Sequence, residues 1–233
     1  MAKLCVALDF DNLEKMHSFV VPLRSSGVVL KIGLGLLPLL GLSDLQKLLD
    51  QGFEIFIDAK LHDIPSQVGR AVATWAQRGV HYLTLHCSGG PAMIQSALAA
   101  AKGSSLKLLG VTLLTSLSDD DVRAMKIGDS AKQRVLINAD VSLKAGLSNF
   151  VCSVSEVADL RALASQLGTK AFTVTPGLFW AAAPSADQSR TFSVHEALAQ
   201  GSDLLVVGRS ILEAKSPLVV VEEINAEIQR TKI

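Results

Sequence analysis

The stretch FEIFIDAKLHDIPSQ, residues 53–67, combines an apolar run with two carboxylates and a lysine at its end. If residues 53–60 form a β-strand, Asp58 and Lys60 share one face of it, ~7 Å apart along the strand. Asp63 follows in a proline-containing loop before a helix, where it can lean over the strand's end. Charges at the C-terminal end of an apolar strand are typical of a barrel strand that carries an active site, although a solvated surface cluster would have the same pattern.

Alternating strand and helix patterns extend over the whole chain. Short β-branched or apolar runs predict eight strands, at residues 4–9, 28–33, 53–60, 82–87, 106–114, 149–153, 172–177 and 203–209. Helical segments lie between and after them, at residues 13–23, 36–50, 65–78, 91–101, 129–144, 155–166, 194–200 and 217–229. Such units predict a single α/β domain over residues 1–233, a (β/α)8 TIM barrel, with a doubly wound open sheet as the alternative.

Composition favours a soluble cytoplasmic protein. Of 233 residues, 49% are hydrophobic and 19% are charged, which is enough apolar surface for a large core. The formal net charge of zero gives no reason to expect nucleic acid or an anionic membrane as a partner. Cys5, Cys87 and Cys152 are widely spaced within apolar runs and are typical of reduced core residues. The apolar runs are shorter than the ~20 residues of a membrane span.

Charges of alternating sign end the first three predicted strands. Asp9, Lys31, Asp58 and Lys60 all have the parity that points into a barrel. Because burying an unpaired ion costs several kcal/mol, we expect these side chains to form one alternating network. Neighbouring aspartates favour the charged form of a lysine, so Lys60 is better suited to donate a proton than to form a Schiff base.

Later strands end in neutral or basic groups. Thr115, after the fifth strand, can bond the edge of a heterocycle, or it can belong to the cap of a helix near Ser118. The pair Gly208 and Arg209 ends the eighth strand, and residues 175–177 end the seventh. Barrels often hold a phosphate at this position, where glycine lets backbone amides approach an anion and arginine can pair with it.

Two further features are less decisive. The long connection at residues 177–190 contains several small residues, which indicates either a lid over an active site or a passive surface loop. His62 and His86 lack the H-x-H or H-E-x-x-H spacing of metal ligands, so the sequence predicts no metal site.

Eight short motifs follow one another in order: ALD (7–9), LKIG (30–33), DAKLHDIP (58–65), HCSGG (86–90), VTLLTS (111–116), VTPG (174–177), DQ (187–188) and VGR (207–209). In this order the chain resembles the orotidine 5′-monophosphate decarboxylase family over nearly its whole length. The resemblance implies a homodimeric enzyme, without metal or cofactor, that converts orotidine 5′-monophosphate to uridine 5′-monophosphate and CO2 in de novo pyrimidine biosynthesis.

The resemblance also implies a role for each charged residue. Asp9 and Lys31 should contact the ribose and brace the charges. Asp58 should face the substrate carboxylate, and Lys60 should protonate C6 of the pyrimidine. Asp63 should reach into the active site of the neighbouring subunit.

The remaining implied contacts concern the base and the phosphate. Thr115 should lie beside the pyrimidine, while Gln188, Arg209 and the backbone at Gly208 should hold the 5′-phosphate under the long loop. Phe179 stands where many relatives have arginine, so phosphate binding must depend on these other groups. Gln67 stands where the family usually has threonine, which weakens the case for a ribose contact there.

Two alternatives remain. Sugar-phosphate lyases of the same barrel group, such as hexulose-phosphate synthases and keto-gulonate-phosphate decarboxylases, share D-x-K-x-x-D but use Mg²⁺ and lack the His-Asp-Ile-Pro continuation found here. A catalytically silent nucleotide-binding protein would keep Gln188 and Arg209 but would lose the alternating aspartates and lysines.

Overall fold

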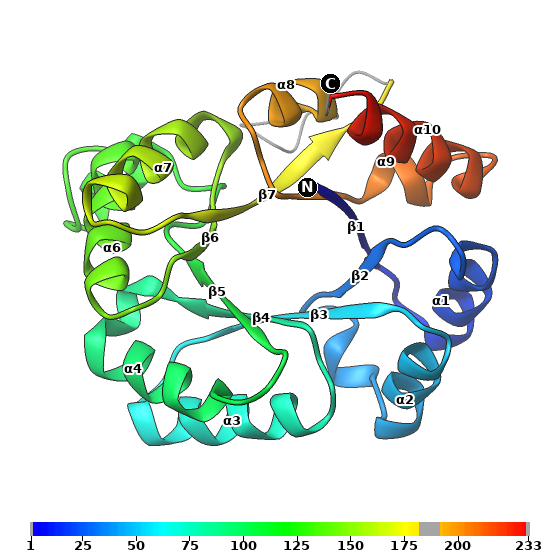
Figure 1. Ribbon diagram of the computed structural model, residues 1–233, viewed down its shortest axis with the longest axis horizontal. Coiled ribbons are helices and arrows are strands. Elements are labelled where there is room, and N and C mark those ends of the chain that lie inside the picture. Colours follow the sequence, from blue (N-terminus) through cyan, green and yellow to red (C-terminus); the bar gives the residue numbers. More distant parts are fainter. Residues whose placement is uncertain (1, 182–191, 232–233) are drawn as a thin grey trace.

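The computed structural model describes residues 2–181 and 192–231, which form a closed ring of strands surrounded by helices (Figure 1). Within these residues, eight parallel strands make the barrel: β1 (Lys3–Ala7), β2 (Val29–Ile32), β3 (Glu54–Leu61), β4 (Tyr82–His86), β5 (Lys107–Val111), β6 (Asn149–Val151), β7 (Phe172–Phe179) and β9 (Leu204–Val207). Pairing of β9 with both β7 and β1 closes the ring, and a short strand, β8 (Phe192–Ser193), extends β7. The predicted (β/α)8 barrel is confirmed, and the open-sheet alternative is wrong.

Helices cover the outside of the ring (Figure 1). They are α1 (Leu13–Val20), α2 (Leu42–Asp50), α3 (Pro65–Gln77), α4 (Gly90–Ala101), α5 (Asp119–Ala124), α6 (Ala131–Lys144), α7 (Val157–Gln166), α8 (Val194–Ala199), α9 (Arg209–Leu212) and α10 (Pro217–Arg230). Four 3-10 turns accompany them: η1 (Val21–Leu23), η2 (Leu37–Leu39), η3 (Cys87–Gly89) and η4 (Val154–Glu156). Among the described helices, none is both long enough and apolar enough to cross a bilayer.

Three segments differ from the sequence-based expectation. The single helix expected at residues 36–50 is divided, because Pro38 lies in η2 and the extended residue Gly41 caps α2. The fifth strand was expected to run to residue 114 but ends at Val111, where the chain turns towards α5. The short helix α9 has four residues, too few for a periodic pattern to predict it, whereas α5 is capped by Ser118, where a helix cap was considered.

Side chains of the strands alternate between two apolar layers. One layer fills the inside of the barrel and consists of Cys5, Ala7, Val29, Phe56, Tyr82, Leu109, Val174, Leu204 and Val206. The other packs under the helices, as Leu4 and Val6 of β1 do. This is the inside and outside assignment predicted for the first strands. The cysteines are buried and unpaired, as expected.

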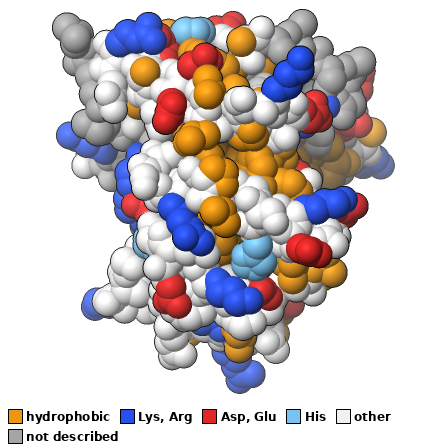
Figure 2. Space-filling model, turned by 90° about the vertical axis from the view of Figure 1, so that its right-hand side faces the viewer, with side chains coloured by type: hydrophobic (Ala, Val, Ile, Leu, Met, Phe, Trp, Pro, Cys, Tyr) orange, Lys and Arg blue, Asp and Glu red, His pale blue; other side chains and the backbone are white. Residues whose placement is uncertain are grey.

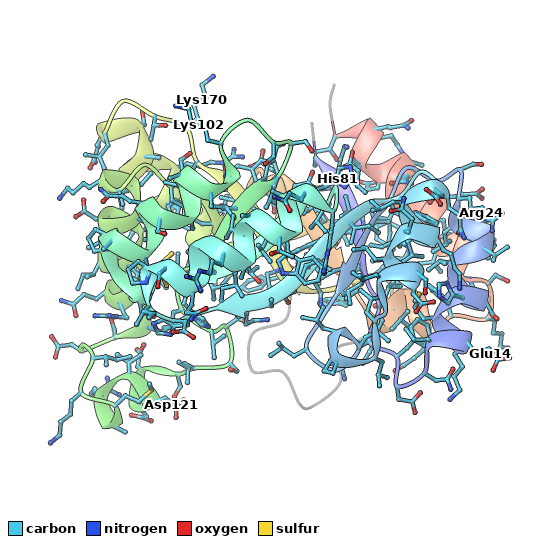
Figure 3. The ribbon with its side chains drawn as sticks, turned by 90° about the horizontal axis from the view of Figure 1, so that it is seen from below. Glu14, Arg24, His81, Lys102, Asp121 and Lys170 are labelled. Atoms are coloured by element: carbon cyan, nitrogen blue, oxygen red, sulfur yellow. The ribbon has the colours of Figure 1, made fainter. Side chains whose placement is uncertain are left out.

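The two ends of the barrel can be told apart in a side view. In Figure 3, His81, Lys102 and Lys170 precede strands and lie at one end, whereas Glu14 and Asp121 follow strands and lie at the other. The second end gathers the C-terminal ends of all the barrel strands, which is where barrel enzymes place their active sites.

One side of the molecule is markedly apolar at its surface. Figure 2 shows apolar side chains gathered in a band on the side that carries α1, α2 and α10. Large exposed apolar residues in or beside these helices include Val21, Leu42 and Val219. Contiguous exposed apolar surface is typical of a face that contacts another protein.

Candidate active site

A cavity of about 660 Å³ lies at the C-terminal ends of the strands, a volume suited to a small-molecule ligand. Its floor is the upper layer of the barrel interior, where Ala7, Phe56 and Val206 contribute apolar surface. Its rim is built from the segments that follow β1, β5, β7 and β9. The cavity therefore has an apolar floor, and connecting segments form its rim.

Four charged side chains on neighbouring strands form what we call the charged network: Asp9, Lys31, Asp58 and Lys60. The Lys60 ammonium donates to both carboxylate oxygens of Asp58 at 2.9 Å. On the other side of Asp58, Nζ of Lys31 lies 3.6 Å from Oδ2. The same Nζ lies 3.8 Å from Oδ1 of Asp9. The alternating arrangement predicted from the sequence is present, and all four residues line the cavity.

Asp58 is the centre of the charged network. Its side chain is only 13% exposed, and the Lys31 side chain is 12% exposed. Burial alone would raise the pKa of Asp58, but Lys31 and Lys60 outweigh it and hold the pKa below the usual value. Asp58 is therefore an anion at neutral pH, held between two cations.

Cys5 contributes a neutral group beneath these charges. Its thiol is fully buried in the barrel interior, and burial raises its pKa far above the usual value. A thiol of this kind stays protonated and unreactive at neutral pH. The surroundings of the charged network are therefore apolar from below, which strengthens its internal interactions.

The backbone at Lys60 is unusual. Its φ of 49° lies in the left-handed region, which a lysine seldom occupies. The pairing of β3 with β4 is irregular between Ile57 and Leu61, so Lys60 lies at a bulge. Bulges often occur next to active sites, where they redirect a side chain.

Another part of the rim is formed by the ends of β7 and β9. Gly208 and Arg209 line the cavity together with Pro176 and Gly177. A Cβ atom added at Gly208 would lie 3.5 Å from the Ala7 Cβ and 3.6 Å from Oδ2 of Asp9, so this glycine lies beside the start of the charged network. The predicted phosphate-binding segments thus lie together at one cavity.

Thr115 also lines the cavity, from the segment between β5 and α5. The helix cap that was the alternative role is provided by Ser118, whose hydroxyl accepts from the Asp121 amide in a capping box. Thr115 is not needed for that cap, and its position is compatible with contact to a heterocycle.

An aromatic wall completes the rim. Phe179 and Trp180 line the cavity where β7 ends. The backbone amide of Trp180 donates to Ser210 at 3.1 Å, and its indole donates to Glu223 at 3.0 Å. The indole also stacks on His195, with ring centroids 5.1 Å apart. These contacts fasten the end of β7 to the following helices.

A sequence model described as "Orotidine 5'-phosphate decarboxylase / HUMPS family" matches residues 2–224. The chain belongs to this family. Two relatives are named orotidine 5'-phosphate decarboxylase. The one from Saccharophagus degradans is 38% identical and the match covers 99% of this chain and 97% of the relative. For the one from Hydrogenovibrio crunogenus the identity is 39% and the coverage 98% and 96%. The structure of orotidine 5'-phosphate decarboxylase from Lactobacillus acidophilus matches with a TM-score of 0.81 and 34% identity, covering 98% of this chain and 99% of that one.

Asp63 and Gln67 are described by the structure and do not line this cavity. Asp63 is exposed, and its carboxylate accepts from the adjacent Ile64 amide at 2.6 Å. It does not line the cavity of its own chain, so its role at an active site stays a prediction. Gln188 lies outside the described residues. Gln67 is exposed in the first turn of α3 and is not at the cavity either.

Thr84 was not anticipated. It is fully buried in β4, and its hydroxyl is bonded to both Asp58 and Lys60. A signal existed in the sequence, because Thr84 has the same parity as Tyr82, which points into the barrel. Metal ligands were not predicted, and within residues 2–181 and 192–231 no three His, Cys, Asp or Glu side chains are grouped to hold an ion. The absence of a metal requirement stays a prediction.

Proposed function

We propose that this protein converts orotidine 5′-monophosphate to uridine 5′-monophosphate and CO2, a step of de novo pyrimidine biosynthesis. The observation that carries the proposal is the charged network that lines the cavity, in a chain whose relatives bear the name of this enzyme. The buried pair at the centre of this network, Lys31 and Asp58, contributes little to stability, because apolar replacements of buried pairs are often neutral or better. Such a pair is expected where chemistry requires it.

Lys60 acts on the carbon from which CO2 departs. When the bond between C6 and the carboxylate breaks, its electron pair stays on C6, with no adjacent carbonyl to delocalise it. The ammonium group of Lys60 stabilises this charge as it forms and then transfers a proton to C6. The neutral amine regains a proton from water. The outcome is a C6–H bond in place of the bond to the carboxylate.

Asp58 has two tasks in this scheme. As an anion bonded to Lys60 at 2.9 Å, it fixes the direction of the ammonium group. It also faces the carboxylate of the bound substrate. The repulsion between the two anions is relieved when CO2 leaves, which lowers the barrier relative to the bound state.

The rest of the nucleotide is held at the rim. Asp9 and Lys31 bind ribose hydroxyls, and Thr115 bonds the pyrimidine edge. Arg209, Gln188 and the backbone at Gly208 bind the phosphate. These contacts are remote from C6, and their binding energy serves to orient the base over the charged network.

The first test is a spectroscopic assay. Purified protein is mixed with orotidine 5′-monophosphate, with and without excess chelator, and the ultraviolet absorbance of the substrate is followed. We expect rapid loss of the substrate band at the same rate in both samples. No loss of the band, together with turnover of a hexulose phosphate only when Mg²⁺ is present, would instead make the protein a metal-dependent sugar-phosphate lyase.

We also infer a homodimer in which Asp63 completes the site of the neighbouring subunit. Asp63 is exposed and is followed by Ile64, a large apolar residue that is 61% exposed. Leu34, which follows β2, is 58% exposed and adds apolar surface. Exposed apolar residues beside an exposed carboxylate support a contact between two copies at this end of the barrel.

Mixing two inactive variants tests the shared site. Asp63→Asn and Lys60→Ala homodimers should each be inactive. After subunit exchange, mixed dimers contain one site with both native residues, so up to about a quarter of all sites should regain activity. If no activity returns although subunits exchange, Asp63 does not act across the interface.

A cytoplasmic location is part of the proposal. It is supported by the free, buried cysteines Cys5, Cys87 and Cys152, since proteins of oxidising compartments usually pair their thiols.

A further inference from the structure

Thr84 of β4 lies opposite the bulge of β3. Pairing between β3 and β4 is regular as far as Ile57 and resumes only at Leu61, while β4 advances by just two residues between the same points. Residues 58–60 of β3 therefore lie opposite one residue of β4. The backbone of Lys60 cannot find its partner in the regular ladder there, so a side chain must provide it.

The directions of the two hydrogen bonds at Thr84 are fixed by chemistry. The amide of Lys60 can only donate, so Oγ1 of Thr84 is the acceptor, at 2.9 Å. The hydroxyl has one proton, and it donates this proton to Oδ1 of Asp58, also at 2.9 Å. One side chain thus satisfies the backbone of Lys60 and the carboxylate of Asp58 at the same time.

We propose that Thr84 is a positioning residue for decarboxylation, because its hydroxyl holds the Lys60 backbone and the Asp58 carboxylate in one geometry. This inference rests on the proposed function. The bond to the Lys60 amide supports the left-handed backbone, with φ of 49°, from which the ammonium group reaches Asp58. The bond to Asp58 prevents the carboxylate from rotating away from that ammonium group.

Other groups that face Asp58 come from the surrounding strands. Lys31 of β2 and Lys60 of β3 are the cations near it. Cys5 of β1 and His86 of β4 also interact with it electrostatically. Burial lowers the pKa of His86, so this imidazole is neutral at neutral pH. Removing the Thr84 hydroxyl leaves these groups in place and takes away one donor, so the Asp58 pKa should rise.

A matched control exists at the other end of the barrel. Thr173 is also fully buried in a strand, and its hydroxyl donates to Asp203 at 3.1 Å. Asp203 is in turn paired with Arg161, and these three residues do not line the cavity. Thr173→Val therefore removes an equivalent hydrogen bond without touching the site.

The experiment compares Thr84→Val, Thr84→Ser and Thr173→Val with the wild type. For Thr84→Val we expect kcat for orotidine 5′-monophosphate to fall by about tenfold or more, with KM changed by less than about threefold, as for loss of a hydrogen bond to a charged group. The acidic limb of its kcat/KM profile should move to higher pH. Thr84→Ser keeps the hydroxyl and should retain most of the activity. Thr173→Val should lower the melting temperature but leave kcat and the pH profile unchanged.

A second readout does not depend on turnover. The carboxyl carbon of Asp58 is followed by ¹³C NMR through a pH titration, in the wild type and in Thr84→Val, or in Thr84→Ala if the valine variant does not fold. We expect a higher Asp58 pKa in the variant. An unchanged Asp58 titration, or a Thr84→Val kcat within twofold of the wild type, would overturn the inference. If the wild type does not consume orotidine 5′-monophosphate, the proposed function fails, and the NMR titration still tests whether Thr84 controls Asp58.

Discussion

Both ends of the barrel contain ion pairs, but the pairs are arranged differently. Where the strands begin, each acid has its own base: Lys3 donates to Glu54 at 2.6 Å, and Arg161 donates to Asp203 at 3.0 Å. Where the strands end, Asp58 is shared by two lysines in a cavity. In a one-to-one pair the base satisfies the hydrogen-bonding capacity of the acid, and no further role is needed to explain the contact. At the carboxyl end, Lys31 lies between Asp58 and Asp9, while the Lys60 ammonium donates to Asp58 inside the cavity. We propose that this ammonium also acts on the bound substrate.

The largest expected effect is on the turnover of a Lys60 variant, and Lys3 at the other end of the barrel provides the comparison. Lys60→Ala should lower kcat by at least about a thousandfold, because it removes both the proton donor and the stabilising charge. Binding of uridine 5′-monophosphate, measured by calorimetry, should change only a few-fold. Lys3→Ala removes an equally close ion pair, with a Lys3 side chain that is 47% exposed, and should leave turnover unchanged. A Lys60→Ala variant with a tenth of the wild-type rate would remove Lys60 from the acid role.

A smaller effect, on KM, is expected at the rim residues that we propose to lie near the phosphate. Arg209→Ala should raise KM by about tenfold to a hundredfold, as expected for loss of a charge-assisted hydrogen bond. Phe179→Arg adds a cation at a position that lines the same cavity and should lower KM. Steady-state kinetics measures both. An unchanged KM in Arg209→Ala would mean that the phosphate binds elsewhere.

The smallest effect concerns stability against pH. The pKa of Asp58 is lowered in the folded protein, so its contribution to stability is present above the ordinary aspartate pKa of about 3.9 and is lost as pH falls through the lowered value. The melting temperature of the wild type relative to Asp58→Asn should therefore rise by a few degrees between about pH 2 and pH 5. Glu54→Gln provides the comparison at the other end. Burial raises the Glu54 pKa, but its bonds to Lys3 and Tyr82 bring it below the usual value.

If the difference in melting temperature between the wild type and Asp58→Asn did not change with pH, this prediction would be wrong. For Glu54→Gln we expect a pH dependence of the same sign but smaller size, because the Lys3 and Glu54 side chains are 47% and 33% exposed and water screens their interaction.

Much of the fold follows from strand alternation. The parity that places Cys5 and Ala7 inside β1 also places Lys31 and Asp58 inside their strands, and the structure has them there. Alternation is a local property of extended backbone, so it can be found in a single sequence. The division of residues 36–50 depends on Pro38 and on the cap at Gly41, which interrupt the periodic pattern, and α9 is too short to have one.

The geometry at Lys60 could not be predicted in the same way. A left-handed conformation is usually signalled by glycine or asparagine, and lysine gives no such signal. The bulge that imposes it arises from pairing with β4, and Thr84 acts from that next strand, 24 residues further along the chain. Asp63 is a different case. Its position after β3 follows from the sequence, but the site in which we expect it to act belongs to another subunit.

The most direct test of the central claim is proton exchange at C6 of the product. If Lys60 gives a proton to C6, it must also remove that proton in the reverse direction, so uridine 5′-monophosphate in D2O should exchange its C6 hydrogen for deuterium. Proton NMR follows the loss of this signal with the wild type, Lys3→Ala and Lys60→Ala. We expect exchange with the wild type and Lys3→Ala, and none above the buffer rate with Lys60→Ala. Equal exchange by all three would contradict the account.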